Sequence, residues 1–90
     1  MAFYLSGTLT VPPQDLERLR AALPLHVRLT RAEAGCRLFV VEEGAGGVFT
    51  VHETFDSADA FAAHQRIRGT EWEMASAAAI RNYRTWEDEA

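Results

Sequence analysis

The sequence has one cysteine, no long apolar run and no excess of basic residues. Cys36 cannot form a disulfide within one chain, which agrees with a reducing compartment. No stretch approaches the roughly 20 apolar residues that cross a bilayer, and residues 1–5 lack the features of a signal peptide. The net charge of -4 disfavours nucleic acid, because a polyanion binds to a basic surface. We therefore expect a soluble, cytoplasmic protein without nucleic-acid or membrane partners.

The length of 90 residues predicts a single domain, residues 1–90. The composition is 48% hydrophobic and 24% charged, which is typical of a globular protein. A chain this short buries only about 60% of its unfolded surface, so its stability is marginal. Association with a second copy would raise that stability.

Four segments have the pattern of strands. Residues 3–10 and 48–55 alternate with a period of two, and residues 36–43 are rich in β-branched and aromatic side chains. Residues 80–86 (IRNYRTW) form the last such segment. The glycine-rich residues 44–47 supply the positive φ angles of a short connection, so the second and third strands are expected to form an antiparallel hairpin.

A first helix is expected from the Pro12-Pro13 pair to about Arg31, because apolar residues recur there at helical spacing. Pro24 lies inside it and lacks a backbone donor, which predicts a kink or a restart at Leu23.

A second helix is expected to start at an Asp56 cap and to end at Gly69. Thr70 and Glu73 have the spacing of a capping box, which predicts a further short helix before the last strand.

The order strand, helix, strand, strand, helix, strand predicts an α+β fold of the ferredoxin-like βαββαβ type, with a four-stranded antiparallel sheet and helices on one face. Alternation places residues 49, 51, 53 and 55 under the helices and Thr50, His52 and Thr54 on the open face. An uncovered sheet face meets water or another sheet. We expect a homodimer formed through this open face, although its threonines also allow a monomer. Four residues are candidates to add apolar area to it: Tyr4, Phe39, Val41 and Tyr83.

Among motifs of known mechanism, the sequence contains no phosphate-binding glycine loop, no Cys-x-x-Cys pair, no His-Glu-x-x-His and no nucleophile elbow. Glu53 is the sharpest candidate for chemistry, because Val51 and Phe55 flank it on the face expected to be buried. A buried carboxylate takes up a proton, finds a partner or faces a wet cavity. The alternative is an ordinary ion pair with one of three arginines: Arg31, Arg68 or Arg81.

Two histidines are expected to reach the same cavity as Glu53. His26 lies on the first helix and His64 on the second, and an imidazole there could act as a general base or bind a phenolic oxygen. The alternative is a structural role for each histidine. A metal site of His26, His64 and Glu53 is conceivable, but their spacing matches no ligand motif.

For other side chains, the sequence gives weaker evidence of a role in the site. Trp72 is expected to form a pocket wall or simply to fill the core. Cys36 follows no basic group, which disfavours a nucleophilic role. Asn82 and Tyr83 point to opposite faces of the last strand, so only one of them can line the pocket.

Three stretches resemble the antibiotic biosynthesis monooxygenase family, especially its quinol-monooxygenase-like branch. They are LPLHVRLTRAEAGCRLF at residues 23–39, VHETFDSADAFAAHQ at residues 51–65, and Trp72 with IRNY at residues 80–83. The resemblance implies the dimeric ferredoxin-like α+β barrel. It also implies the insertion of oxygen from dioxygen into a quinol or aromatic substrate without flavin, haem or metal.

On that resemblance, the catalytic candidates are His64 or His26 as the base and Glu53 as the group that orients it. The substrate-binding candidates are Trp72, Phe55, Val51, Tyr83 and Phe61. Family members that modify polyketides have an asparagine and a tryptophan where Val51 and Phe55 stand here, so those roles do not transfer. The alternative function is a non-catalytic, dimeric module that binds a small ligand or serves in stress, because one fold hosts many functions.

Overall fold

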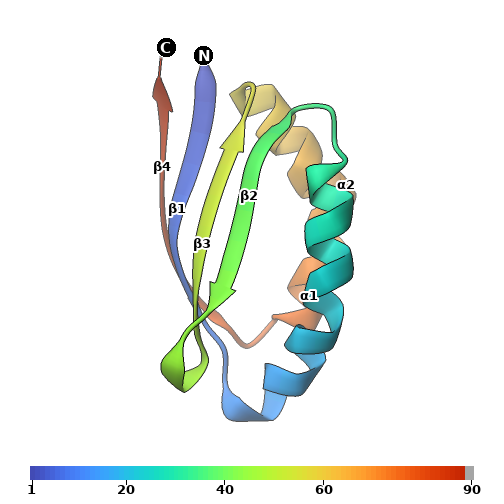
Figure 1. The fold of residues 1–90 in the computed structure, drawn as a ribbon, viewed down its shortest axis with the longest axis vertical. Coiled ribbons are helices and arrows are strands. Elements are labelled where there is room, and N and C mark those ends of the chain that lie inside the picture. Colours follow the sequence, from blue (N-terminus) through green and yellow to red (C-terminus); the bar gives the residue numbers. More distant parts are fainter. Residues whose placement is uncertain (89–90) are drawn as a thin grey trace.

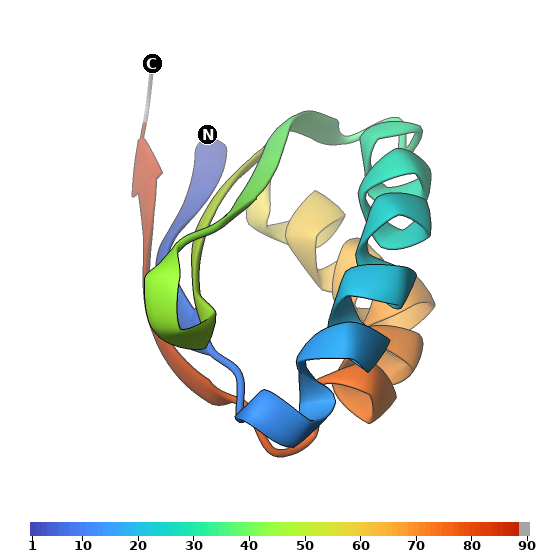
Figure 2. The same cartoon turned by 60° about the horizontal axis from the view of Figure 1, so that its bottom comes forward.

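The computed structural model describes residues 1–88, apart from the side chains of residues 70, 71 and 73–75 in the second helix. A sheet forms one layer and two helices form the other (Figure 1; Figure 2). The strands are β1 (Ala2–Thr10), β2 (Cys36–Glu43), β3 (Val48–Phe55) and β4 (Ile80–Asp88), and the helices are α1 (Leu16–Arg31) and α2 (Ala58–Ala75). Neither helix is long and apolar enough, over its described residues, to cross a membrane.

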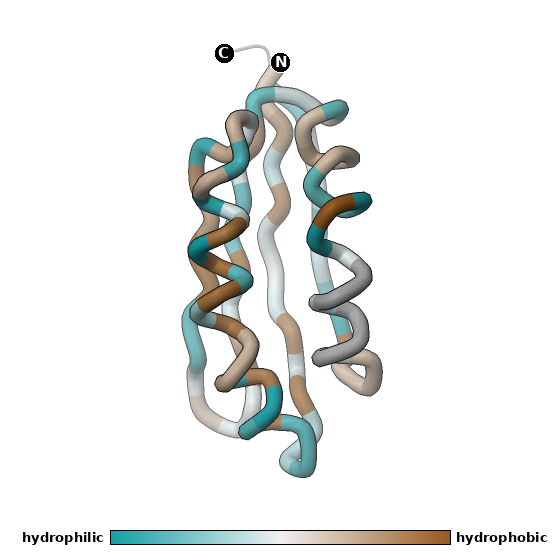
Figure 3. The backbone as a smooth tube through the Cα atoms, turned by 90° about the vertical axis from the view of Figure 1, so that its right-hand side faces the viewer, coloured by the Kyte–Doolittle hydropathy of each residue, from teal (hydrophilic) through white to brown (hydrophobic). Residues whose placement is uncertain are grey.

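The four strands form one antiparallel sheet in the order β2-β3-β1-β4. The central strand β1 pairs with β3 on one side and β4 on the other, so Leu5 lies opposite both Glu53 and Thr85. Both helices lie against the same face of this sheet (Figure 3). The element order and topology confirm the predicted ferredoxin-like α+β fold.

The hairpin between β2 and β3 depends on two glycines with positive φ, Gly46 at 69° and Gly47 at 78°. A β-carbon on Gly47 would also lie 2.5 Å from the carbonyl oxygen of Val11, which is closer than atoms can approach. Glycine is therefore required at Gly47 by both backbone conformation and space.

The first helix differs from its prediction at two points. A short 3-10 turn (Pro13–Asp15) precedes α1, and α1 continues through Pro24, so of the predicted alternatives, a kink or a restart, the restart does not occur. Leu19 and Leu23 pack against the core of the sheet on the helix face. His26 and Thr30, after the proline, are buried as well. Burial on both sides of Pro24 thus offsets the backbone hydrogen bond that it cannot make.

The second helix also differs. The Ser57 hydroxyl, and not Asp56, accepts a hydrogen bond from the backbone N–H of Ala60 (3.1 Å), while the Asp56 carboxylate pairs with Arg37. The helix does not end at Gly69, because Gly69 lacks the positive φ of a helix-ending glycine and α2 runs on to Ala75. The predicted separate third helix is therefore wrong.

The side chains of the proposed capping box, Thr70 and Glu73, lie outside the described side chains. Their backbone is part of the continuous helix α2.

The core lies between the layers, and its buried members are Leu5, Leu9, Val11, Leu19, Phe49 and Val51. The predicted faces of β3 are confirmed: Val51, Glu53 and Phe55 are buried, and His52 is exposed.

The expectation that Phe39, Val41 and Tyr83 lie on the open face is wrong. Phe39 pairs with Glu53, Val41 pairs with Val51, and all three side chains line the interior. Only Tyr4 of the four candidates lies on the open face, where its ring stacks on Trp86 with centroids 5.3 Å apart.

Candidate active site

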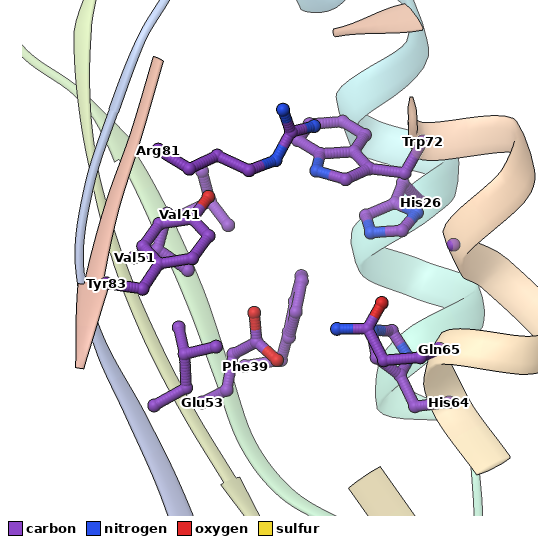
Figure 4. Close-up of a pocket in the computed structure, with 12 residues that line it drawn as sticks. His26, Phe39, Val41, Val51, Glu53, His64, Gln65, Trp72, Arg81 and Tyr83 are labelled. Atoms are coloured by element: carbon purple, nitrogen blue, oxygen red, sulfur yellow. The ribbon is translucent and has the colours of Figure 1, made fainter. Parts of the chain in front are cut away.

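A cavity of about 170 Å³ lies between the sheet and the helices (Figure 4). Both helices and all four strands contribute side chains to its lining. The sequence-predicted residues that line it are His26, Val51, Glu53, His64, Trp72 and Tyr83. The structure therefore brings together all three catalytic candidates and three of the five substrate-binding candidates.

Phe55 and Phe61 lie outside the cavity lining. The Phe55 ring is fully buried and lies 5.1 Å from the imidazole of His64, measured between centroids. The Phe61 ring contacts Phe55 edge to face and stacks on Phe3 at 4.5 Å. Both rings pack near His64 without lining the cavity, so they support the imidazole and are not part of the cavity surface.

Glu53 is a buried carboxyl group with no hydrogen-bond partner for its Oε1 atom among the described residues. Its Oε1 atom is inaccessible to solvent and accepts or donates no hydrogen bond within the described residues. Burial, reinforced by the negative charge of Glu33, raises the pKa of Glu53 from 4.5 to about 7. At mildly acidic pH the group is therefore a neutral carboxylic acid, which can donate a hydrogen bond to a ligand.

The ion pair offered as an alternative for Glu53 does not form. The Nε atom of Arg31 donates to the carbonyl oxygen of Phe39, and Arg81 donates to Ser76. Arg68 donates to Glu33.

His26 is held by aromatic stacking. Its ring lies over Trp72 with centroids 4.3 Å apart and planes inclined by 12°, and it meets Phe39 edge to face. Burial, together with the neighbouring His64 and Arg68, lowers the pKa of His26 from 6.5 to about 4. The imidazole of His26 is therefore neutral at physiological pH.

His64 is held by a carboxylate. Its Nδ1 atom lies 3.2 Å from Oε2 of Glu33, and the same oxygen accepts a hydrogen bond from Nε of Arg68 at 3.2 Å. The side chain of His64 is only 5% exposed. Glu53 was the carboxylate expected to orient the base, whereas the carboxylate that contacts His64 is Glu33.

Tyr83, and not Asn82, faces the cavity, where burial raises the pKa of its phenol to about 12. Tyr83 is therefore a neutral hydroxyl group that can donate or accept a hydrogen bond. With Glu53 on β3, it places polar groups on the sheet side of the cavity, opposite the imidazoles of the helix side (Figure 4).

Several lining residues were not identified from the sequence as site residues. They are Leu5, Phe39, Val41, Gln65, Gly69 and Arg81. Phe39 and Val41 lie in an almost wholly apolar run, in which alternation does not distinguish the two faces. Gly69 was interpreted as a helix end, although its missing side chain leaves room in the cavity.

The part of the chain with described side chains contains no group of three or more His, Cys, Asp or Glu residues arranged to hold a metal ion. Burial, followed by the charges of Glu33 and Glu53, raises the pKa of the Cys36 thiol. A raised pKa disfavours the reactive thiolate. The polar groups of the cavity are therefore the remaining candidates for chemistry.

The fold is a ferredoxin-like α+β domain with a cavity between its sheet and its helices. The sequence profile of the antibiotic biosynthesis monooxygenase family matches residues 2–68, and the chain belongs to this family. A comparison with curated protein sequences gives no significant match.

Solved structures share the fold at low sequence identity. Rv0793 of Mycobacterium tuberculosis superimposes with a TM-score of 0.85 at 21% identity, covering 100% of this chain and 97% of its own. A protein of Nitrosomonas europaea gives 0.82 at 17%, covering all of both chains. A protein of Deinococcus radiodurans gives 0.76 at 24%, covering 100% of this chain and 94% of its own.

Proposed function

We propose that this protein is a monooxygenase that oxidises a small hydroxylated aromatic molecule of the quinol type with dioxygen, with the substrate itself supplying the electrons. The observation that carries the proposal is the cavity: an aromatic-walled space onto which an imidazole with a carboxylate partner and an unpartnered carboxyl group both face. Membership of the antibiotic biosynthesis monooxygenase family supports the reaction class.

The size of the cavity selects a small substrate. An apolar cavity of about 150 Å³ holds benzene, so a space of about 170 Å³ accepts one substituted ring. Phe39 and Trp72 supply aromatic walls, and Val41 and Val51 supply aliphatic ones. A polycyclic substrate would need the cavity to open toward solvent.

His64 is the proposed base. His26 is a poor proton acceptor because its pKa is about 4 and its ring is stacked on Trp72. His64 has Glu33 beside it, and a carboxylate stabilises the imidazolium that forms when the base takes a proton. His26 then serves as a neutral wall that can hydrogen-bond to the substrate.

Glu53 is proposed to act as a neutral carboxylic acid. Glu53 lines the cavity, so its protonated carboxyl group can donate a hydrogen bond to a substrate oxygen. This differs from the orienting role first assigned to Glu53.

The chemistry balances without an added reductant. His64 removes a proton from a substrate hydroxyl, and the resulting anion transfers one electron to dioxygen. The two radicals then combine to form a carbon–oxygen bond at a ring carbon that bears hydrogen, which gives a hydroperoxide after protonation. Loss of that hydrogen as a proton breaks the O–O bond, leaving a new carbonyl and water. The substrate loses four electrons, and dioxygen gains four.

Oxygen uptake and isotope incorporation test the proposal. With ¹⁸O₂ and a panel of monocyclic and bicyclic quinols, one labelled oxygen should appear in the product and one in water. His64→Gln should lower kcat by about 10²–10⁴-fold. His52→Gln is the matched control, because His52 lies on the open face, where it pairs with Ser6. Turnover that survives His64→Gln would contradict the base assignment.

The second candidate function, a ligand-binding module, predicts a different outcome. Quinols would then bind in the cavity without oxygen uptake above the uncatalysed rate, and His64→Gln would leave that rate unchanged. This result, obtained with the folded protein under air, would overturn the enzyme proposal.

A homodimer through the open sheet face is part of the proposal. This face exposes three large apolar side chains on the two edge strands of the sheet: Leu38 (47%) on β2, and Ile80 (71%) and Trp86 (41%) on β4. A second sheet that covers these apolar side chains removes them from water and so stabilises a small domain.

A further inference from the structure

Glu33 lies in the segment between α1 and β2, and its side chain links this segment to α2. Its Oε2 atom accepts hydrogen bonds from two side chains of α2, His64 Nδ1 and Arg68 Nε, both at 3.2 Å. The Glu33 side chain is only 14% exposed. One partly buried carboxylate thus contacts two side chains that lie four residues apart on the same helix.

The backbone holds Glu33 in place from both sides. Its N–H donates to the carbonyl oxygen of Thr30, and its own carbonyl oxygen accepts from the N–H of Cys36, both at 3.0 Å. Two residues later, the carbonyl oxygen of Gly35 accepts a hydrogen bond from Asp56 (2.8 Å). The carboxylate therefore projects from a hydrogen-bonded turn and not from a free loop.

Close packing fixes the same turn against the second helix. A β-carbon on Gly35 would lie 2.5 Å from the β-carbon of Ala60, so only glycine allows this approach. Ala60 lies one helical turn before His64 on α2. The distance between Glu33 and His64 is thereby set by backbone contacts as well as by their own hydrogen bond.

We propose that Glu33 is a positioning residue that holds the imidazole of His64 as the Nδ1–H tautomer and leaves Nε2 as the nitrogen free to accept a proton. This inference rests on the proposed function, in which His64 is the base. A carboxylate paired with a guanidinium accepts hydrogen bonds and donates none, so the hydrogen between Glu33 and His64 belongs to Nδ1. The same arrangement of a carboxylate behind an imidazole serves enzymes on unrelated folds.

Arg68 has a separate part in this arrangement. Its guanidinium shares Oε2 of Glu33 with His64, which compensates the charge of a carboxylate held away from solvent. The negative charge of Glu33 also contributes to the raised pKa of Glu53 across the cavity. Glu33 thus affects both polar groups proposed for the reaction. It contacts His64 directly, and its negative charge acts on Glu53 through space.

The tautomer of His64 is measured directly by ¹⁵N NMR of the imidazole nitrogens, without substrate. In the wild type, Nδ1 should show the shift of a protonated nitrogen and Nε2 that of an unprotonated one. Glu33→Ala should move the ring toward the Nε2–H form, whereas Glu33→Gln, which keeps a carbonyl acceptor, should retain the wild-type pattern. A wild-type ring in the Nε2–H form, or a pattern unchanged in Glu33→Ala, would overturn the inference.

Kinetics separate positioning from simple support of the fold. Glu33→Ala should lower kcat at least about tenfold with little change in KM, because the ligand still fits but the base presents the wrong nitrogen. Glu33→Gln should recover part of that loss. Equal loss in both variants, or a change confined to KM, would contradict positioning. The NMR result stands even when no substrate turns over, so failure of the proposed function is distinguished from failure of this inference.

Glu42→Gln is the matched control for these variants, because it removes an exposed carboxylate from the same half of the chain. It should leave both the imidazole shifts and kcat at wild-type values. Should Glu33→Ala fail to fold, Glu33→Gln and Glu33→Asp keep the test decisive. The shorter carboxylate of Glu33→Asp should shift the tautomer populations toward Nε2–H, and a wild-type pattern there would contradict positioning by this contact.

Discussion

The imidazole of His26 lies flat against the indole of Trp72, and together they separate two cavities. On one side lies the interior cavity, and on the other a space of about 140 Å³ between α1 and α2. The second space is lined by small and aliphatic side chains of α1 and by Arg68. The stacked pair is therefore the wall between the candidate site and the groove between the helices.

Removing the indole should join the two cavities. Trp72→Ala is expected to release a bound ligand at least about tenfold faster, because the cavity then opens between the helices. Trp72→Phe keeps an aromatic wall and should stay near the wild-type rate. The measurement is the dissociation rate of hydroquinone under nitrogen, from NMR line shapes. Equal rates in Trp72→Ala and the wild type would show that ligand leaves by another route.

Glu53 should make stability depend on pH. Its pKa is raised in the folded state, so its contribution to stability is complete below 4.5 and is lost as pH rises toward about 7. In Glu53→Gln the side chain does not ionise, so this loss of folding stability does not occur. The variant should therefore gain stability over the wild type by about 1.4 kcal/mol per pH unit across this window, up to about 3 kcal/mol. Urea unfolding at a series of pH values measures the difference.

His26 explains why the wild type alone would hide this effect. Its pKa is lowered in the folded state, so its contribution is complete above 6.5 and is lost as pH falls toward about 4. Between 4.5 and 6.5, the two groups act in opposite directions and nearly cancel. A constant stability difference between Glu53→Gln and the wild type from pH 4.5 to 7 would contradict the raised pKa.

Replacing Gly69 with alanine should raise the stability of the fold and weaken ligand binding. Gly69 lies inside α2 and lines the cavity, and among the described side chains an added β-carbon would meet only the flexible end of Gln65, at 3.2 Å. Gly69→Ala is expected to stabilise the fold by about 0.4–1 kcal/mol, because it restricts the unfolded chain. The methyl group should weaken hydroquinone binding by about fivefold or more, equivalent to about 1 kcal/mol. Thermal unfolding and calorimetric titration check both, and tighter binding would contradict the location of the site.

The open sheet face is the proposed dimer interface, so a charge placed on it should prevent two copies of the chain from associating. Leu38→Glu replaces an exposed apolar side chain of this face with a charge and is expected to convert the proposed dimer into a monomer. Sedimentation velocity across a range of concentrations measures the change. Ile67→Glu is the matched control, since Ile67 is 58% exposed on α2 and away from the sheet. If the control dissociates as readily as Leu38→Glu, the interface lies elsewhere.

The sequence predicted correctly which side chains of β3 face the interior, because alternation was clear there. Val51, Glu53 and Phe55 alternate with polar residues, so their burial followed from the period of a strand. Alternation did not predict which face of the sheet Phe39 and Val41 occupy, because β2 is apolar on both faces and irregular between Cys36 and Leu38. The pairing of Phe39 with Glu53 decided their side.

Helix ends were predicted less well, because local residues permit more than one solution. Gly69 is typical of a helix end, yet packing of α2 on the sheet keeps the helix intact through it. Asp56 and Ser57 both have capping side chains, and the competing partner Arg37 leaves the cap to Ser57.

The sequence by itself determined the order of the elements and sent Glu53, His26 and His64 toward one interior, because these depend on periodicity along the chain. Only the tertiary structure decided which carboxylate contacts which imidazole. Glu33 and His64 are 31 residues apart, and their contact arises from the approach of Gly35 to Ala60, which no local pattern encodes. The same packing leaves Glu53 without a partner within the described residues, and burial there, together with the charge of Glu33, raises the pKa of its carboxyl group.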